Sequence, residues 1–579
     1  MRQGPARERA VIASWIAKLV GNATLGAVLC ALGLLIPPAA AGADSLVPAD
    51  SRPAAVSSLL PAGDFEDDVD WGLKEGARLE READNRFLRL EVAEPGKTVM
   101  VYRLVPVAAD DAALELSYRV RHEGIKTGKQ KWFDGRIMMN WKNEAGETVR
   151  PSPSAPSFKG TSKNGWESRS QKFLVPDGAT RLEIMFTLFN ATAGSLDFDD
   201  VLLRRTDPAP VKAALEEAAR RRAAEIARRA AAVKPQVPVP SADRLPPELR
   251  VVGNQIQTAD GKPVWLQGVS LASLEWSAAG ENILKSTEHA ITGWKANVIR
   301  QPVRETFWFG KGDYQNDGGA GYRQLVEDSI NLAAAHGAYV VIDLHRFRAP
   351  TVDHVAFWRD VAAKYRNHPA VLFELLNEPH DISWEVWRDG GPVTDQAKAA
   401  AVAGQGTTLA ENDAKLIAFH SVGMQAVVDA VRETGARNIV IVGGLDWGYD
   451  LSGIVAGYAL DDRGGNGIVY STHVYPWKSD WQGKFLALVE KYPLFVGELG
   501  GEPEPMSFIP PDRHEDPHTW APDMLGLIQK HKLHWTGWCF HPKSSPRLLA
   551  DWDYTPTEFW GRYVKDALAG RQFEVRRMR

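Results

Sequence analysis

Cysteine is almost absent from this sequence, and its scarcity excludes a fold held together by disulfide bonds. Only Cys30 and Cys539 occur among the 579 residues. Cys30 lies in an apolar N-terminal segment of the kind removed on export, so we expect one thiol and no internal disulfide in the mature chain. The fold must therefore gain its stability from the size of its hydrophobic core.

An excess of charge of one sign is missing as well. The chain has 68 lysine and arginine residues against 73 aspartate and glutamate residues, for a net charge of −5. General binders of polyanions are strongly basic, so this balance argues against a nucleic-acid partner. The composition, 44% hydrophobic and 24% charged, is that of a globular protein, and the length predicts two or three domains.

The apolar run at the N-terminus, LGAVLCALGLLI (25–36), is shorter than the roughly 20 residues of a membrane-spanning helix. It follows a basic region and precedes the small residues AAAGA (39–43), which is the pattern of a signal peptide. We predict a signal peptide at residues 1–43, a flexible segment at 44–59, and a secreted or periplasmic protein without stable membrane insertion after cleavage. A retained N-terminal anchor is the alternative.

Residues 60–206 contain short runs in which apolar and polar residues alternate between turn residues, a pattern typical of a β-sandwich or jelly roll. The six clearest runs are 87–93, 98–105, 113–121, 135–141, 181–189 and 195–205. The last run, SLDFDDVLLRR, resembles the closing strand of carbohydrate-binding modules. If the domain binds glycan, the candidate aromatic platforms are Trp132, Phe133, Trp141 and Trp166. The alternative is that these residues belong to the core or rim of a stabilising domain.

A linker is predicted at residues 207–248. VKAALEEAARRRAAEIARRAAAV (211–233) is rich in alanine and places glutamates four residues before arginines, which favours a helix. Because its acids and arginines are interleaved, a solvated spacer is favoured over a polyanion site. KPQVPVPSADRLPP (234–247) then predicts a stiff, extended segment.

Residues 249–579 alternate strand-like and helix-like patterns, which predicts a (β/α)8 barrel. The eight strand candidates are 263–271, 296–303, 338–345, 370–378, 438–444, 467–475, 493–500 and 534–540. An open, doubly wound sheet is the alternative architecture. No G-x-G-x-x-G follows the first strand, so nothing indicates a dinucleotide-binding fold.

Polar and aromatic residues close several of these strands. In a (β/α)8 barrel the C-terminal ends of the strands meet on one face, which carries the active site. The residues expected to converge there are Arg300, His345, Asn377, Glu378, His473, Tyr475, Glu498 and Trp538.

Two carboxyl groups across a cleft with aromatic walls are what the cleavage of a glycosidic bond requires. One must donate a proton to the leaving sugar, and the other must be ionised. Arg300 is expected to keep Glu498 ionised, since a nearby cation lowers a carboxyl pKa by about 1–3 units. Asn377 is suited to hydrogen-bond a sugar hydroxyl, and Tyr475 to donate to the nucleophile.

These residues lie in segments that resemble glycoside hydrolase family 5, the clan A cellulase family, over roughly residues 250–570. VLFELLNEPH (371–380) resembles the acid/base region and FVGELGG (495–501) the nucleophile strand, and NVIRQPV, VIDLH, THVYPW and WTGWCF complete the set. The resemblance implies a retaining mechanism with Glu378 as acid/base, Glu498 as nucleophile and carboxyls about 5–5.5 Å apart. It implies supporting roles for Arg300, His345, Asn377, His473, Tyr475 and Trp538.

The resemblance favours an endo-β-1,4-glucanase (cellulase) that acts as a monomer on β-linked polysaccharide or oligosaccharide, with no cofactor and no metal. The alternatives are a mannan- or xyloglucan-active hydrolase, an exo-acting β-glucosidase, or a polysaccharide-binding protein without turnover. The long segment 381–413 after the fourth strand puts an open cleft in doubt. HEDPH (514–518) matches H-E-x-x-H, but its prolines argue against a helix and hence against a zinc site.

Substrate choice in such a cleft depends on aromatic residues in the loops beyond the strands. Two or three of the loop tryptophans are expected to stack on sugars, and Trp447 and Trp477 follow their strands most closely. The tryptophans considered are Trp308, Trp384, Trp387, Trp447, Trp477 and Trp481.

Overall fold

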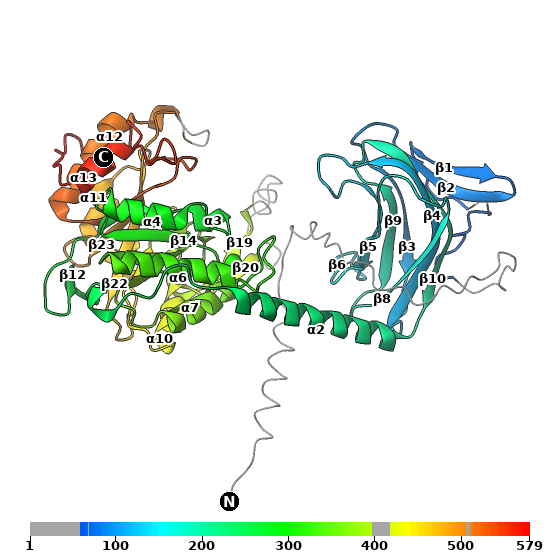
Figure 1. Cartoon of the computed structure of the whole chain (residues 1–579), viewed down its shortest axis with the longest axis horizontal. Coiled ribbons are helices and arrows are strands. Elements are labelled where there is room, and N and C mark those ends of the chain that lie inside the picture. Colours follow the sequence, from blue (N-terminus) through cyan, green and yellow to red (C-terminus); the bar gives the residue numbers. More distant parts are fainter. Residues whose placement is uncertain (1–57, 68, 397–416, 505–508, 510) are drawn as a thin grey trace, which may run out of the picture. The chain divides into compact units, whose positions relative to one another are not determined.

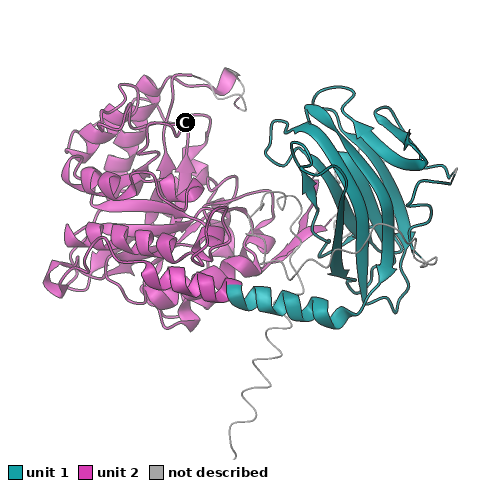
Figure 2. Ribbon diagram, turned by 45° about the vertical axis from the view of Figure 1, so that its right-hand side comes forward, with its two compact units in different colours: residues 1–221 teal, residues 222–579 magenta. Residues whose placement is uncertain are grey.

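The computed structural model describes residues 58–67, 69–396, 417–504, 509 and 511–579. The predicted signal peptide at 1–43 and nearly all of the predicted flexible segment at 44–59 lie outside the described residues. The chain divides into two compact units, residues 1–221 and 222–579 (Figure 2). No helix in the described part of the chain is long and apolar enough to cross a membrane.

Unit 1 contains two antiparallel sheets, as expected for a sandwich. Their strand orders are β1-β2-β10-β4-β8 and β3-β9-β5-β6, with β7 paired to β5. The strands are β1 Ala77–Glu82, β2 Asn85–Glu91, β3 Val99–Pro106, β4 Ala113–Lys126, β5 Gly135–Lys142, β6 Thr148–Val149, β7 Ser157–Phe158, β8 Glu167–Leu174, β9 Arg181–Leu188 and β10 Ala193–Arg205. All six predicted strands are present, whereas the polar edge strands β1 and β8 were not predicted.

Alternation along the strands builds the core of the sandwich. Leu88, Leu90 and Leu196 are fully buried between the sheets, while their neighbours Arg89 and Asp197 face the other side. Trp141 is also fully buried, with its ring 5.9 Å from that of Phe173. Of the two interpretations given for Trp141, the structure therefore supports the second, a residue of the core.

Helix α2 (Pro208–Ala232) follows the sandwich. Proline is tolerated at its first position, where the missing N–H would have no helical partner. Ion pairs between residues three and four apart support it, among them Arg221 with Glu217 at 2.7 Å and Arg228 with Glu225 at 2.8 Å. A short 3-10 turn, η1 (Ala242–Arg244), precedes the barrel.

Unit 2 is a closed barrel of eight parallel strands in sequence order, which confirms the predicted fold (Figure 1). The strands are β13 Gln267–Ser270, β14 Val298–Val303, β15 Tyr339–Leu344, β17 Val371–Glu374, β21 Val440–Gly443, β22 Ile468–Val474, β23 Leu494–Leu499 and β24 His534–Gly537. Each lies inside the run predicted for it.

Helices cover the outside of the barrel, with α4, α6, α7 and α10 running along its strands in Figure 1. Among the described residues after α2, the α-helices are α3 Ser273–Trp276, α4 Ile283–Thr292, α5 Glu305–Trp308, α6 Ala320–Ala335, α7 Val352–Lys364, α8 Trp384–Asp389, α10 Met424–Glu433, α11 Trp481–Lys484, α12 Pro517–His531 and α13 Gly561–Leu568. A π-helical segment, η3 Ile454–Tyr458, and two 3-10 turns, η4 Leu486–Leu488 and η5 Pro511–Arg513, are also present.

In the described part of unit 2, three two-stranded sheets lie outside the barrel. They are β11 Leu249–Val252 with β12 Gln255–Thr258, β16 Phe347–Arg348 with β18 Glu378–Pro379, and β19 Gly391–Thr394 with β20 Ile417–Ser421. The predicted insertion at 381–413 thus contains α8 and β19, the first strand of the β19–β20 hairpin. Residues 397–416 lie outside the described part.

The barrel strands bury two different surfaces. Outward residues such as Val340 and Ile342 join the large core beneath the helices, while inward residues such as Val341 form a separate apolar layer inside the barrel. Because side chains alternate, the next inward position after Val341 is Asp343. The apolar layer therefore ends where a charged layer begins, at the C-terminal ends of the strands.

The HEDPH segment was interpreted partly wrongly. Helix α12 begins inside it at Pro517 with Asp516 as its N-cap, and the helix also contains Pro522. Proline is tolerated at the first position of a helix, so Pro517 does not prevent a helix from starting there. His514 nevertheless lies before the helix and His518 within it, so the two imidazoles do not share the helical face that a zinc peptidase needs.

Candidate active site

Arg300 is the centre of the charged layer and is fully buried. Its Nε donates to Glu374 Oε2 at 2.6 Å, and its Nη1 donates to Glu498 Oε1 at 2.8 Å. Its Nη2 donates to Asn377 Oδ1 at 2.7 Å and lies 3.1 Å from Asp343 Oδ2. Burial would lower the pKa of this guanidinium, but the three carboxylates raise it above its ordinary value. One cation thus orients residues from three other strands.

Glu498, near the end of β23, is held by two donors. Besides Arg300, the hydroxyl of Tyr475 donates to Glu498 Oε2 at 2.6 Å. Burial alone would raise the pKa of this carboxyl, but the charges of His473, Arg300 and His345 outweigh it and lower that pKa. Burial and Glu498 raise the pKa of Tyr475, so its hydroxyl keeps its proton and remains a donor. Glu498 is therefore an ionised carboxylate with a fixed orientation.

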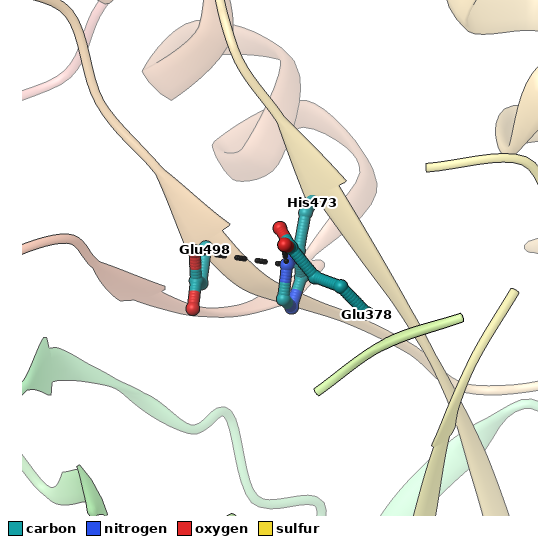
Figure 3. Close-up of side chains that lie close together, drawn as sticks. All are labelled: Glu378, His473 and Glu498. Atoms are coloured by element: carbon teal, nitrogen blue, oxygen red, sulfur yellow. Dashed lines mark hydrogen bonds and ion pairs between the residues drawn. The ribbon is translucent and has the colours of Figure 1, made fainter. Parts of the chain in front are cut away.

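Glu378 lies across from Glu498, and the imidazole of His473 stands between them (Figure 3). His473 Nδ1 is 2.9 Å from Glu378 Oε1 and 3.7 Å from Glu498 Oε2. The Glu378 side chain is 14% exposed, against 5% for Glu498. Burial would lower the pKa of His473, but Glu498, Glu374 and Glu378 raise it to about 10. His473 is thus an imidazolium at neutral pH.

Glycine makes room for this cluster on β23. A Cβ at Gly497 would lie 2.6 Å from Ser471 Oγ and 3.1 Å from Glu374 Oε1. Ser471 itself donates to Glu374 Oε1 at 3.1 Å. Any side chain at residue 497 would therefore displace the groups that hold Glu374 in place.

His345 is the second buried imidazole of the site. Its Nδ1 is 2.6 Å from Asp343 Oδ2, its Nε2 is 3.6 Å from Glu275 Oε2, and its ring stacks on Trp538 at 5.5 Å. Burial would lower its pKa, but the Asp343 carboxylate next to it raises the pKa above its ordinary value. Trp538 is only 7% exposed and forms one wall of the site.

Asn377 offers an unused donor beside Glu378. Its Oδ1 is occupied by Arg300, whereas its Nδ2 has no hydrogen-bond partner among the described residues. A buried polar atom without a partner is uncommon in proteins and usually has a specific reason. This amide is suited to donate to a hydroxyl of a bound molecule.

Glu378, His473 and Glu498 also bring three potential metal-ligand atoms within 4.8 Å of one another. A histidine ligand must be neutral, since the metal binds the lone pair of the imidazole nitrogen. The raised pKa of His473 works against this, because the two carboxylates hold the ring as a cation. The arrangement is better suited to moving protons than to holding a metal.

The loop tryptophans separate into two groups. Trp308, Trp387 and Trp481 are fully buried, so they are not among the two or three tryptophans expected to stack on sugars. Trp384 is half-buried and packs on Trp387 and Tyr458.

Trp447 and Trp477, the two favoured tryptophans, remain accessible. Trp447 is 45% exposed and lies flat on His380, with centroids 3.6 Å apart. The backbone N–H of Trp447 donates to the carbonyl of Pro379, the residue that follows Glu378 in the chain. This bond holds the backbone of Trp447 next to the Glu378 segment. Trp477 is half-buried and stacks on Tyr475 at 5.0 Å.

In the sandwich, Trp132 and Phe133 are half-buried and pack against each other and against Phe189. Trp166 is half-buried beneath two arginines.

Sequence reasoning missed some members of this site. Asp343 could have been found, because it lies two residues before His345 in the same predicted strand run, 338–345, and so faces the same side. Glu374, the acid at the end of β17, lies inside the barrel and accepts a hydrogen bond from Arg300. Glu275 comes from α3 and Phe347 from β16, outside the barrel strands, and no strand pattern pointed to either.

The site lies within a segment that matches a known family. Residues 257–544 match the model of the family Cellulase (glycosyl hydrolase family 5). Endoglucanase MaCel5A of Microbulbifer sp. (strain ALW1) is 24% identical over 305 residues, which cover 50% of this chain and 50% of that protein. Cellulase CelDZ1 of Thermoanaerobacterium sp is 25% identical over 339 residues, which cover 54% of this chain and 77% of that protein.

Solved structures also resemble the chain. The β-glucanase SdGluc5_26A from Saccharophagus degradans, crystallised with cellotetraose, is 22% identical and aligns with a TM-score of 0.45. The alignment covers 58% of this chain and 97% of that one. The chain spans about half the length of MaCel5A, the first of the curated relatives it matches.

Proposed function

Residues 257–544 form a domain of the cellulase family, glycosyl hydrolase family 5, and from this premise we propose that the protein is a retaining β-glycoside hydrolase that cleaves β-1,4-linked glucan. Glu498 is the nucleophile and Glu378 the acid/base. The observation that carries the proposal is the asymmetric environment of the two carboxyls. Glu498 accepts hydrogen bonds from Arg300 and Tyr475, whereas the side chain of Glu378 is more exposed to solvent.

In the first step, Glu498 Oε2 or Oε1 attacks the anomeric carbon while Glu378 gives its proton to the bridging oxygen. The lowered pKa of Glu498 keeps the nucleophile ionised.

In the second step, Glu378 takes a proton from water, and the water attacks the glycosyl ester on Glu498. The separation of the two groups supports this two-step route. One oxygen of each carboxyl and the nitrogen of His473 lie within 4.8 Å of one another. Retaining enzymes place the carboxyls about 5–5.5 Å apart, whereas inverting enzymes need about 6.5–9.5 Å to admit a water molecule.

The surrounding residues suggest how the sugar chain lies. Asn377 Nδ2 donates to the hydroxyl next to the reacting carbon, where such bonds strengthen in the transition state. Trp538, stacked on His345, faces the sugar that is transferred. Trp447, fixed after Glu378 through Pro379, faces the sugar that leaves.

The β19–β20 hairpin borders the Glu378 side of the site. Arg348 donates to the carbonyl of Thr394, and its guanidinium lies 5.8 Å from the ring of Phe419. Its neighbour Phe347 pairs with Glu378 in the β16–β18 sheet. We propose endo-acting cleavage of soluble β-1,4-glucan, with the hairpin limiting how far the leaving chain can extend. Export and a monomeric state remain proposals.

The test compares the wild type with Glu378→Gln and Glu498→Gln on hydroxyethyl cellulose and on an aryl β-cellobioside. An aryl leaving group of low pKa departs without a proton, so the second substrate bypasses the acid. We expect both variants to lose about 10³-fold or more on the polymer. On the aryl glycoside, Glu378→Gln should release a burst of phenolate, and Glu498→Gln should release none.

A wild type that frees no reducing ends from β-glucan, mannan or xyloglucan would overturn the enzyme assignment. Bursts from both variants, or from Glu498→Gln alone, would overturn the assignment of roles. Arg359→Met serves as the control, since its ion pair with Glu433 is exposed and involves neither carboxyl of the site.

A further inference from the structure

A hollow of about 420 Å³ opens on unit 1, far in sequence from the residues of the barrel site. It lies on the outer face of the β1-β2-β10-β4-β8 sheet, because Arg89 and Asp197, which line it, alternate with the buried residues Leu88, Leu90 and Leu196 of the sandwich core. Sites for small molecules have volumes of about 300–1,000 Å³, so this hollow is large enough for one. The chemistry of the barrel makes no use of it.

The floor of the hollow is an aspartate held by two arginines. Arg89 donates from Nε and Nη2 to the two oxygens of Asp197, both at 2.8 Å, and Arg121 donates from Nε to Oδ2 at 2.9 Å. The Asp197 side chain is only 3% exposed, whereas those of Arg89 and Arg121 are 27% and 24% exposed. The acid thus fixes two guanidinium groups at the surface of the hollow.

Aromatic rings hold the same arginines from the side. The guanidinium of Arg121 lies 5.1 Å from the ring of Phe87 and 4.7 Å from that of Trp166, and that of Arg89 lies 5.4 Å from Phe87. Within the described part of unit 1, Nη1 of Arg89 and Nη2 of Arg121 make no hydrogen bond. These donors are fixed before any ligand arrives, so binding costs little side-chain entropy.

The charge of the lining narrows the class of ligand. Three arginines and four acids face the hollow, namely Arg81, Arg89, Arg121, Glu80, Glu82, Glu123 and Asp197. The charges nearly cancel, and an anionic ligand would meet the excess acid. A neutral ligand that both donates and accepts hydrogen bonds fits alternating guanidinium and carboxylate groups. Adjacent hydroxyls on a sugar ring have this property.

We propose that this hollow is a binding site for a neutral carbohydrate chain, with Arg89 and Arg121 donating to its hydroxyls. The choice of a β-glucan as the preferred ligand rests on the function proposed for the barrel. A second site on the same chain raises the local concentration of substrate for the first one.

The test is hydrogen exchange on the full-length chain carrying Glu498→Gln, which stops turnover during the measurement. Cellotetraose, mannotetraose and tetragalacturonate are the probes. We expect cellotetraose to protect peptides covering 80–91, 117–126 and 193–199, in addition to any protection of the barrel strands. Because the two units give separate peptides, failure of the barrel function and failure of this site are distinguishable.

Variants decide whether the protection arises in the hollow. Arg121→Ala removes charged donors and should raise the dissociation constant for the sandwich peptides about ten- to a hundredfold. Ser195→Phe keeps both arginines, fills the hollow with a ring, and should have a similar effect. The control is Lys172→Ala. Lys172 lies on β8 of the same sheet, 3.9 Å from Glu115, and does not line the hollow. This variant should change the dissociation constant less than about twofold.

No protection of the sandwich by either neutral glycan would overturn the proposal. So would protection by tetragalacturonate alone, or equal losses in Ser195→Phe and Lys172→Ala.

Discussion

The two units both use arginine to hold buried acids, in opposite proportions. In the barrel, one arginine, Arg300, serves three carboxylates and an amide. In the sandwich, one carboxylate, Asp197, serves two arginines. Surplus acid in the barrel raises the pKa of His473 and creates a place for a mobile proton. The two arginines held by Asp197 keep further donors in fixed positions, which suit binding without proton transfer.

Removal of the single barrel cation should have the largest effect. Arg300→Met leaves Asp343, Glu374 and Glu498 buried without their common partner, and breaking a buried ion pair costs about 3–5 kcal/mol. We expect a loss of this size in the free energy of unfolding, read from hydrogen exchange of barrel peptides, with sandwich peptides unchanged.

The matched control is Arg359→Met, whose partner Glu433 lies at 2.7 Å with both side chains more than half exposed. It should change the free energy of unfolding by less than about 1 kcal/mol. A loss in Arg300→Met no larger than in this control would contradict the central role of Arg300.

The second-largest effect is expected in the pH dependence of barrel stability, through Glu374. Burial would raise the pKa of Glu374, but Arg300 and His473 lower it to about 2. A depressed folded-state pKa adds stability above the unfolded value, near 4.5, that is lost as the pH falls toward 2. The contribution at neutral pH is about 3 kcal/mol.

Urea unfolding of the wild type should therefore show barrel stability falling between about pH 4.5 and pH 2. Glu374→Gln should be less stable at neutral pH and should lose less over this interval. An equally steep decline in the variant would show that other carboxyls cause it.

Asp197→Asn should disturb only the sandwich. The amide keeps the shape of the side chain but removes the charge that holds Arg89 and Arg121, and such charged hydrogen bonds contribute about 1.5–3 kcal/mol. Exchange of sandwich peptides should speed up accordingly while barrel peptides stay as they are. Faster exchange in both units would mean that the two clusters are not independent.

The accessible tryptophans should give the smallest effects. Trp447→Ala removes a stacking surface worth about 0.5–1.5 kcal/mol, so KM for soluble glucan should rise about two- to tenfold with little change in kcat. Trp477→Ala loosens Tyr475 against Glu498 and should lower kcat instead. Initial-rate kinetics separate the two, and an identical pattern in both variants would refute this division.

Much of the barrel could be predicted because its signals are local. Each strand is an apolar run, and parallel strands bring their C-terminal ends to one face, so the ends of the strands identified the residues that now surround Arg300. Burial of the tryptophans could not be predicted in this way. Trp308 and Trp447 both follow barrel strands, but whether a ring turns into the core depends on helices that pack there from elsewhere in the chain.

In the sandwich, too, features that depend on distant parts of the chain could not be predicted. The strands with alternating apolar residues were predicted, whereas β1 (ARLERE) is too polar to be recognised as a strand before its partner β2 is known. Arg89, Arg121 and Asp197 lie on three different strands, at positions that become neighbours only through the pairing of β10 with β2 and β4. No spacing in the sequence relates them.

The stereochemistry of the first product tests the central claim most directly. If Glu498 forms a glycosyl ester that water then opens with help from Glu378, the anomeric centre is inverted twice. Proton NMR during the first minutes of cellotetraose hydrolysis should then show the β-anomer appearing first, with the α-anomer growing only by mutarotation. An α-anomer that appears first would contradict the double displacement.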